Sequence, residues 1–167
     1  MKVLYLCRHA KSSWADAGMD DFDRPLNERG FRNAPHMAKV FKDRGEPLDL
    51  IISSPALRAK TTADFFKTAM SIGDHAYRED RAIHHAERST LHRIVNNLPN
   101  ASDRVMLFGH MPGFGLLVDH LTDSGISALP TCGLVRIDLM VDDWSLVTKA
   151  SGTLVWIDYP KRYPGQG

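Results

Sequence analysis

Three short, largely apolar runs, each followed by a polar turn, constrain the fold of this chain most strongly. They are residues 3–7, 48–53 and 104–108. Apolar runs of this length bounded by turns are typical of buried strands. Segments with apolar residues at helical spacing separate the runs, so strands and helices alternate. This alternation predicts a mostly parallel sheet with helices on both faces.

The helical segments are recognised from their spacing and their end signals. The first is expected over about 26–44, because its apolar side chains recur every three or four residues and Gly45 follows it. A second should begin with Ser54 as its N-cap and Pro55 as its first helical residue, and should end near Ala69. Further helices are expected over about 89–97 and 112–121, with a weak strand over 81–84.

The C-terminal part changes character. Residues 134–139 and 153–159 resemble two strands, separated by a turn at Asp142–Asp143, that would pair antiparallel at one edge of the sheet. With 167 residues, the chain falls within the ~100–200 residues of one domain. We therefore expect a single α/β domain over 1–167: a three-layer sandwich with a mostly parallel central sheet, helices on both faces and an antiparallel edge near the C-terminus.

Composition excludes several classes of protein. Lys and Arg total 21 against 20 Asp and Glu, so no charge excess suggests a nucleic-acid or membrane-surface partner. No apolar run approaches the ~18 residues of a membrane span, and residues 3–7 are too few for the core of a signal peptide. The two cysteines, Cys7 and Cys132, make neither a disulfide framework nor a zinc site. A cytoplasmic location is expected.

Three polar turns should meet at one edge of the sheet, because ligands of such sheets bind beyond the carboxyl ends of the strands. The turns are residues 8–14, 53–58 and 109–112, and they carry two arginines and two histidines: Arg8, His9, Arg58 and His110. Guanidinium groups match phosphate oxygens, and a neutral imidazole is a nucleophile near pH 7. These residues therefore outline a site for phosphoryl transfer.

Four motifs in this order resemble the histidine phosphatase superfamily, of the phosphoglycerate mutase-like type. They are Arg8-His9-Ala10-Lys11-Ser12-Ser13-Trp14, Arg24-Pro25-Leu26-Asn27-Glu28-Arg29-Gly30, Ser53-Ser54-Pro55-Ala56-Leu57-Arg58 and Gly109-His110-Met111-Pro112-Gly113. The short length and the first motif are most similar to SixA-type phosphohistidine phosphatases. The resemblance covers about residues 1–120, and the C-terminal part only by its strand pattern.

The resemblance implies a role for each of the four residues. His9 would be the nucleophile and form a phosphohistidine intermediate, and Arg8 and Arg58 would bind the phosphoryl oxygens. His110 would donate to the same group as its charge develops. The family needs neither a metal nor another cofactor. Ala10, Ala15 and Asn27 depart from residues that are common in relatives.

Further site candidates follow from their positions. Ser12 and Ser13 in the first turn, and His85 near the end of the weak strand, are candidates for contacts with the substrate phosphate. The general acid stays open among two aspartates of the first loop and two later glutamates: Asp21, Asp23, Glu79 and Glu87. A nitrogen leaving group needs less from a placed acid than an alkoxide does, so a missing acid would favour phosphohistidine as substrate.

Other kinds of site are less consistent with the sequence. His84 and His85, with Glu87, suggest a metal, but adjacent residues of a strand point to opposite faces and chelate poorly. Six positions after Cys7 is Ser13, where a cysteine phosphatase needs arginine. The chain also lacks a P-loop and a complete dinucleotide fingerprint.

The sequence therefore predicts a cofactor-independent phosphatase that acts through a covalent phosphohistidine. Its substrate is expected to be a phosphohistidine protein, as for SixA, and its product inorganic phosphate. The alternatives are a phosphatase of small phosphate esters or sugar phosphates, or a module that binds a phosphorylated ligand without turnover. A mutase is disfavoured, because mutases of this family carry longer insertions over the pocket.

Overall fold

The computed structural model describes all 167 residues and contains one six-stranded sheet. The strand order is β3-β2-β4-β1-β5-β6, in which the first four strands pair parallel and the last two pair antiparallel. This is the predicted mostly parallel α/β sheet with an antiparallel edge. The strands are β1 (Lys2–Arg8), β2 (Leu50–Ser53), β3 (Tyr77–Glu79), β4 (Arg104–Gly109), β5 (Leu134–Leu139) and β6 (Gly152–Asp158).

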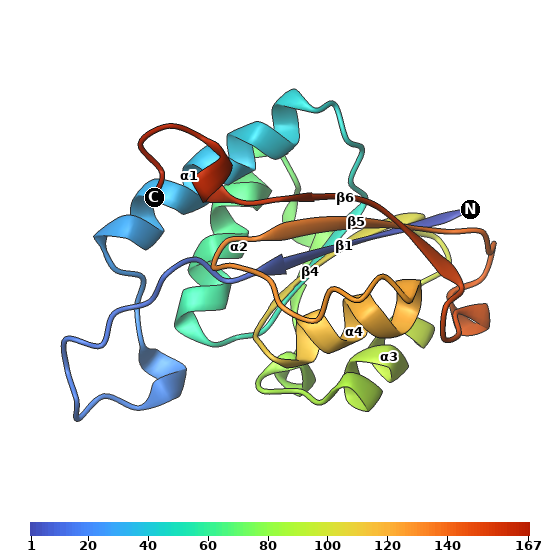
Figure 1. The fold of residues 1–167 in the computed structure, drawn as a ribbon, viewed down its shortest axis with the longest axis horizontal. Coiled ribbons are helices and arrows are strands. Elements are labelled where there is room, and N and C mark those ends of the chain that lie inside the picture. Colours follow the sequence, from blue (N-terminus) through green and yellow to red (C-terminus); the bar gives the residue numbers. More distant parts are fainter.

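Two pairs of helices cover the two faces of the sheet (Figure 1). On one face lie α1 (Glu28–Asp43) and α2 (Leu57–Ala69), and on the other lie α3 (Arg88–Asn96) and α4 (Gly113–Thr122). None of the helices is both long enough and apolar enough to span a bilayer.

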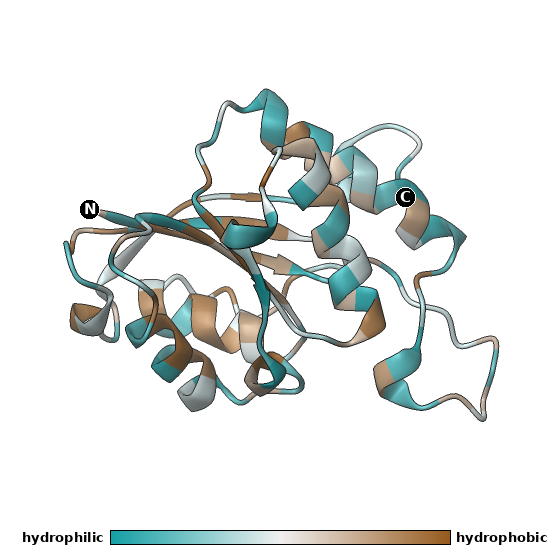
Figure 2. Ribbon diagram, turned by 180° about the vertical axis from the view of Figure 1, so that it is seen from behind, coloured by the Kyte–Doolittle hydropathy of each residue, from teal (hydrophilic) through white to brown (hydrophobic).

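Alternation along the strands builds a separate core on each face. In β1, Tyr5 and Cys7 pack with α1 and α2, whereas Leu4 and Leu6 pack with α3 and α4. All four side chains are fully buried. Figure 2 shows the resulting apolar colour along the central strands, with hydrophilic loops around them. Because both of their faces are covered, the central strands β1, β2 and β4 are continuous buried runs rather than alternating ones.

Two local predictions were wrong. Helix α2 begins at Leu57, with Ala56 at its N-cap, and Ser54 and Pro55 lie in the turn before it. The Ser54 hydroxyl accepts a hydrogen bond from the Ala56 amide, as a capping side chain does, but the chain has not yet entered the helix. The strand expected over 81–84 is a short 3₁₀ turn, Arg81–Ile83, and β3 lies just before it.

The loop after β1 projects from the body of the molecule, where it is blue in Figure 1. It carries a single 3₁₀ turn, η1 (Asp21–Asp23), which Asp20 caps by accepting from the Phe22 amide. The loop ends where Asn27 caps α1 by accepting from the Gly30 amide at 2.9 Å. It leaves β1 at the carboxyl end of that strand and leads into α1, so it lies at the same edge of the sheet as the predicted site.

The start of α4 packs directly on the segment that follows β3. A Cβ on Gly113 would lie 2.2 Å from the Ala86 carbonyl oxygen, which is far inside van der Waals contact. We predict that Gly113→Ala lowers the free energy of unfolding by about 1–3 kcal/mol, because backbone has to move to relieve the overlap. Urea denaturation of this variant and of Gly18→Ala, whose Cβ meets no atom closer than 3.4 Å, would measure the difference. Equal midpoints for the two variants would contradict this packing.

Candidate active site

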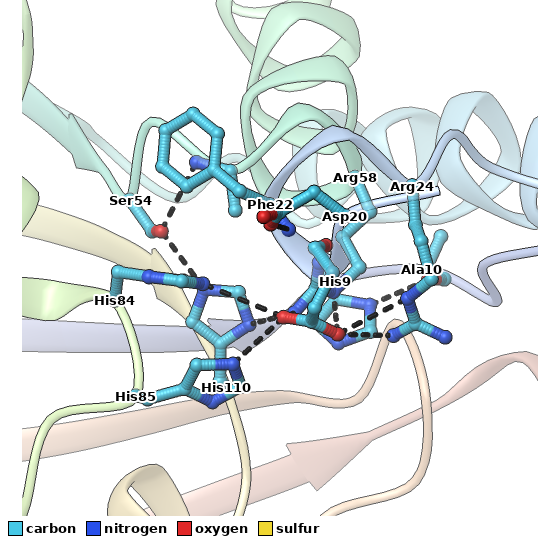
Figure 3. A network of polar contacts seen from close by, with 12 residues as sticks. His9, Ala10, Asp20, Phe22, Arg24, Ser54, Arg58, His84, His85 and His110 are labelled. Atoms are coloured by element: carbon cyan, nitrogen blue, oxygen red, sulfur yellow. Dashed lines mark hydrogen bonds and ion pairs between the residues drawn. The ribbon is translucent and has the colours of Figure 1, made fainter. Parts of the chain in front are cut away.

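Three of the predicted residues meet where β2, β4 and β1 end side by side. His9 directly follows β1, Arg58 lies in the first turn of α2 after β2, and His110 directly follows β4. Because these strands are parallel neighbours, their carboxyl ends lie at one edge, and the three side chains point toward one another there (Figure 3).

The His9 ring is held in one tautomer. Its Nδ1 lies 2.7 Å from the carbonyl oxygen of Ala10, a distance that requires Nδ1 to carry the proton and donate. Its Nε2 therefore carries the lone pair. The turn after β1 is fixed to α2, because the Ala10 amide donates to the Thr62 hydroxyl at 3.0 Å. The ring is 8% exposed and its Nε2 lies 3.4 Å from Nε of Arg58.

Both site histidines are neutral at pH 7. Burial, together with the nearby Arg58 and Arg8 charges, lowers the pKa of His9 from 6.5 to about 3. Burial, followed by His9 and Arg58, lowers the pKa of His110 to about 2. A neutral imidazole with an unprotonated Nε2 is the form in which histidine attacks phosphorus.

His110 links Arg58 to the turn before α2. Its Nε2 lies 2.8 Å from the Ser54 hydroxyl oxygen, and its Nδ1 lies 3.3 Å from Nη2 of Arg58. Since guanidinium only donates, Nδ1 of His110 accepts and Nε2 carries the proton. The ring centroids of His110 and His9 are 5.2 Å apart. Ser54 thus orients His110, a role that the sequence did not indicate.

Arg58 is 1% exposed and is held by Asp21 of the projecting loop. Its Nη2 donates to the Asp21 carboxylate at 2.9 Å, and its Nη1 donates to the Asp21 carbonyl. His85 Nε2 lies 2.7 Å from the same carboxylate oxygen. These hydrogen bonds and the charges of Arg58 and Arg24 outweigh the partial burial of Asp21, and hold the pKa of its carboxyl well below the usual range.

Two further arginines border the pocket. Arg8 donates through Nη1 to the Leu129 carbonyl at 2.7 Å, while its Nε is buried without a partner. Arg24 is 7% exposed and donates through Nε to the Asp21 carboxylate at 3.1 Å. Its Nη1 is buried without a partner, and its guanidinium lies 3.5 Å from the ring centroid of Trp14.

These side chains enclose a cavity of about 300 Å³. It is lined by three arginines, three histidines and six other residues: Arg8, His9, Lys11, Ser12, Trp14, Asp21, Arg24, Arg58, His85, His110, Met111 and Thr131. The concentration of guanidinium groups around a neutral imidazole suits a dianionic phosphoryl group.

Of the further site candidates from the sequence, Ser12, His85 and Asp21 line this cavity. Four others are not among its lining residues: Ser13, Asp23, Glu79 and Glu87. The Ser13 hydroxyl accepts from the Ala15 amide, and Glu79 pairs with Lys60 at 2.8 Å. Of the carboxyl groups considered for the general acid, Asp21 alone borders the pocket.

The sequence did not place Trp14 in the pocket, and it offered Arg24, with Arg81, only as a replacement for Arg58 in binding phosphate. In the structure Arg24 lines the pocket together with Arg58. The expectation that His84 and His85 point to opposite faces was also wrong. They do not lie on a strand, and both rings approach Asp21.

Known proteins share this fold, and a family model matches the N-terminal part of the sequence. A sequence model of the histidine phosphatase superfamily (branch 1) matches residues 4–82. The structure of a protein assigned as a phosphohistidine phosphatase SixA, from Agrobacterium tumefaciens, superposes with a TM-score of 0.81 at 29% identity, covering 95% of this chain and 98% of that one.

The chain thus resembles the histidine phosphatase superfamily in sequence over residues 4–82, and it has a SixA-like fold.

Other relatives extend the comparison over nearly the whole chain. A SixA protein histidine phosphatase in complex with tungstate has the same fold, with a TM-score of 0.81 at 21% identity over 96% of this chain and 98% of that one. An uncharacterized chloroplastic protein of Arabidopsis thaliana is 27% identical over 92% of this chain and 73% of its own length. The sequence match and the SixA-like fold together support phosphatase activity.

The buried neutral histidines of this site predict a loss of stability in acid. An unfolded histidine takes up a proton near pH 6.5, whereas His110 in the folded state stays neutral to about pH 2. The unfolded state then binds more protons, so the free energy of unfolding falls as the pH decreases below 6.5. We predict that His110→Gln reduces this slope by about 1.4 kcal/mol per pH unit between about pH 6 and 4.5. Chemical denaturation at several pH values measures both slopes, and equal slopes would contradict the neutral buried state.

Proposed function

We propose that this chain is a phosphohistidine protein phosphatase that acts through a covalent intermediate on His9. The observation that carries the proposal is the locked tautomer: Nδ1 donates to the Ala10 carbonyl, so the lone pair of Nε2 faces the arginines of the pocket. The SixA-like fold supports the same reading.

In the first step the lone pair of His9 Nε2 attacks phosphorus. The bond from phosphorus to the leaving nitrogen of the substrate breaks, and the substrate imidazole departs neutral, because phosphohistidine arrives protonated on its other ring nitrogen. His9 keeps its Nδ1 proton throughout, donated to the Ala10 carbonyl. That hydrogen bond stabilises the positive charge that the ring acquires when Nε2 becomes bonded to phosphorus.

In the second step water attacks the phosphorus of the intermediate. The P–Nε2 bond breaks, its electron pair returns to His9, and both protons of the water leave on phosphate as the monoanion. Charge is conserved, since the zwitterionic phosphohistidine carries one net negative charge, as the released phosphate does. The second step regenerates the neutral imidazole with its Nδ1 proton in place.

The arginines stabilise the phosphoryl group while it moves from the leaving nitrogen of the substrate to Nε2 of His9. Arg8, Arg24 and Arg58 bring three positive charges to a dianion, and two of them have a buried nitrogen with no partner in the protein: Nε of Arg8 and Nη1 of Arg24. Such donors favour a ligand with several acceptor oxygens. Phosphoryl transfer depends mainly on positioned charge of this kind.

His110 adds a switchable donor. Without a ligand its Nδ1 accepts from Arg58, and its pKa is about 2 because of burial and surrounding positive charge. A phosphate dianion placed beside Nδ1 reverses the sign of the local charge and favours protonation. His110 then donates to a phosphoryl oxygen, while Ser54 accepts from Nε2.

Asp21 is a positioning residue in this scheme. Its carboxylate is ionised, holds Arg58 and Arg24, and has no proton to give to a leaving group. An ester needs a proton on its departing alkoxide, whereas protonated phosphohistidine does not. The absence of a protonated acid in the pocket therefore favours phosphohistidine over small phosphate esters and sugar phosphates.

A comparison of substrates tests this preference. We expect kcat/KM for a phosphohistidine peptide to exceed that for p-nitrophenyl phosphate and for hexose phosphates by about 100-fold or more, since a general acid is typically worth 10²–10⁴. EDTA should leave all the rates unchanged. Faster turnover of a sugar phosphate would favour the small-molecule alternative. No turnover of any substrate, with phosphate still bound, would mean a binding module.

We predict that His9→Ala abolishes turnover and retains part of the phosphate binding, because the arginines are still present. Rapid quenching of the wild type with labelled substrate, followed by peptide mass spectrometry, should find the phosphoryl group on the peptide containing His9. Activity of His9→Ala within tenfold of wild type, or a label on another residue, would remove His9 from the nucleophile role.

We also predict that Arg58→Lys lowers kcat by roughly 10²–10³, or ~2.7–4 kcal/mol, with a smaller change in KM. Lysine keeps the charge but loses the planar pair of donors, and it no longer reaches both Asp21 and His110. Steady-state kinetics on the phosphohistidine peptide measures both constants. A normal kcat would mean that Arg58 supplies only diffuse charge.

A further inference from the structure

Two consecutive histidines face one carboxylate beside the pocket. Nε2 of His85 lies 2.7 Å, and Nε2 of His84 lies 3.5 Å, from the same Oδ2 atom of Asp21. The three possible ligand atoms all lie within 4.8 Å of one another. Figure 3 shows both histidine rings entering from the segment after β3, opposite the arginines.

The backbone explains why neighbouring side chains converge. Ile83 is buried in the core and anchors the end of the 3₁₀ turn, and His85 has a φ of +50°. This left-handed conformation turns the chain, so that the two rings lie 4.2 Å apart between centroids rather than on opposite sides. Asp21 reaches them from η1 on the projecting loop, so the three residues come from segments about 60 residues apart in sequence.

The donors suit a divalent transition metal. Two imidazole nitrogens and one carboxylate oxygen are a donor set that zinc takes in proteins, with a fourth position left for water. Tetrahedral ligand atoms around Zn²⁺ lie about 3.4 Å apart at bond lengths of 2.0–2.1 Å. The distances from Oδ2 of Asp21 to the two histidine nitrogens, 2.7 and 3.5 Å, lie on both sides of that value. Nε2 of His84 is also buried without a hydrogen-bond partner, so no hydrogen bond of that atom has to be broken when it binds an ion.

We propose that Asp21, His84 and His85 form a binding site for Zn²⁺ or a similar transition-metal ion, and that the bound ion inhibits the phosphatase. The ion is not a cofactor of the reaction. Arg58 donates to the same Oδ2 atom at 2.9 Å, so an ion on that oxygen competes with the guanidinium and disturbs the phosphate-binding arginines.

The ion also joins two segments that are distant in sequence. It links η1 of the projecting loop to the segment that carries His84 and His85, beside the pocket that Asp21 and His85 line. The charges of Arg58 and Arg24 oppose the cation, so the affinity should lie well below that of a structural zinc site. Inhibition should therefore be reversible by a chelator.

Calorimetry with Zn²⁺ alone tests the site without any assay of activity. The metal-free wild type should bind one equivalent, and His84→Ala should bind about 100-fold more weakly because one of three protein ligands is lost. His75→Ala is the matched control, since His75 is exposed on the 3₁₀ turn before β3, away from the cluster, and should bind as the wild type does. Equal affinity of His84→Ala and wild type, or the absence of stoichiometric binding, would overturn the site.

The inhibitory role rests on the proposed function and has its own test. His84→Ala should keep the basal rate on the phosphohistidine peptide and resist a Zn²⁺ concentration that inhibits the wild type, and EDTA should restore the wild type. Equal inhibition of both proteins would overturn the inhibitory role of this site. If neither protein turned the peptide over, the proposed function would fail, whereas calorimetry would still decide the metal site.

Discussion

A neutral imidazole surrounded by guanidinium groups is the arrangement on which the rest of the site depends. His9 keeps its Nε2 lone pair because burial and nearby arginine charges prevent its protonation, and because the Ala10 carbonyl holds the proton on Nδ1. The same positive charges that deprotonate the ring attract the phosphoryl group to it. The same arginine charges thus keep the nucleophile neutral and bind the group that it attacks. The Asp21 carboxylate pairs with Arg24 and Arg58 and compensates their positive charge when no phosphate is bound.

The fold produces this arrangement through the ends of three adjacent parallel strands. Because β2, β4 and β1 are buried on both faces, their apolar sequences are easily recognised, and the rule for ligand sites at carboxyl strand ends then brings Arg58, His110 and His9 together. Strand β5 falls over residues 134–139, as its apolar pattern predicts. These features depend on periodicity within a few residues, so sequence alone was sufficient for them.

Other features depend on contacts between distant segments, and the sequence did not reveal them. The sequence Ser54-Pro55 is typical of a helix start, so it favoured a helix from Pro55. In the structure the Ser54 hydroxyl is bonded to His110, and α2 starts at Leu57. His84 and His85 were expected on a strand, whereas a left-handed residue in a loop turns both toward Asp21. The positions of such side chains follow from how a long loop folds back on the sheet, which no local pattern encodes.

The most direct test of the central claim is a crystal structure of the protein with orthovanadate, which takes the five-coordinate geometry of a phosphoryl group in transfer. The account predicts vanadium bonded to Nε2 of His9, with equatorial oxygens on Arg8, Arg24 and Arg58 and with Nδ1 still donating to the Ala10 carbonyl. Vanadate bound through Nδ1, or held by the arginines with His9 turned away, would contradict it.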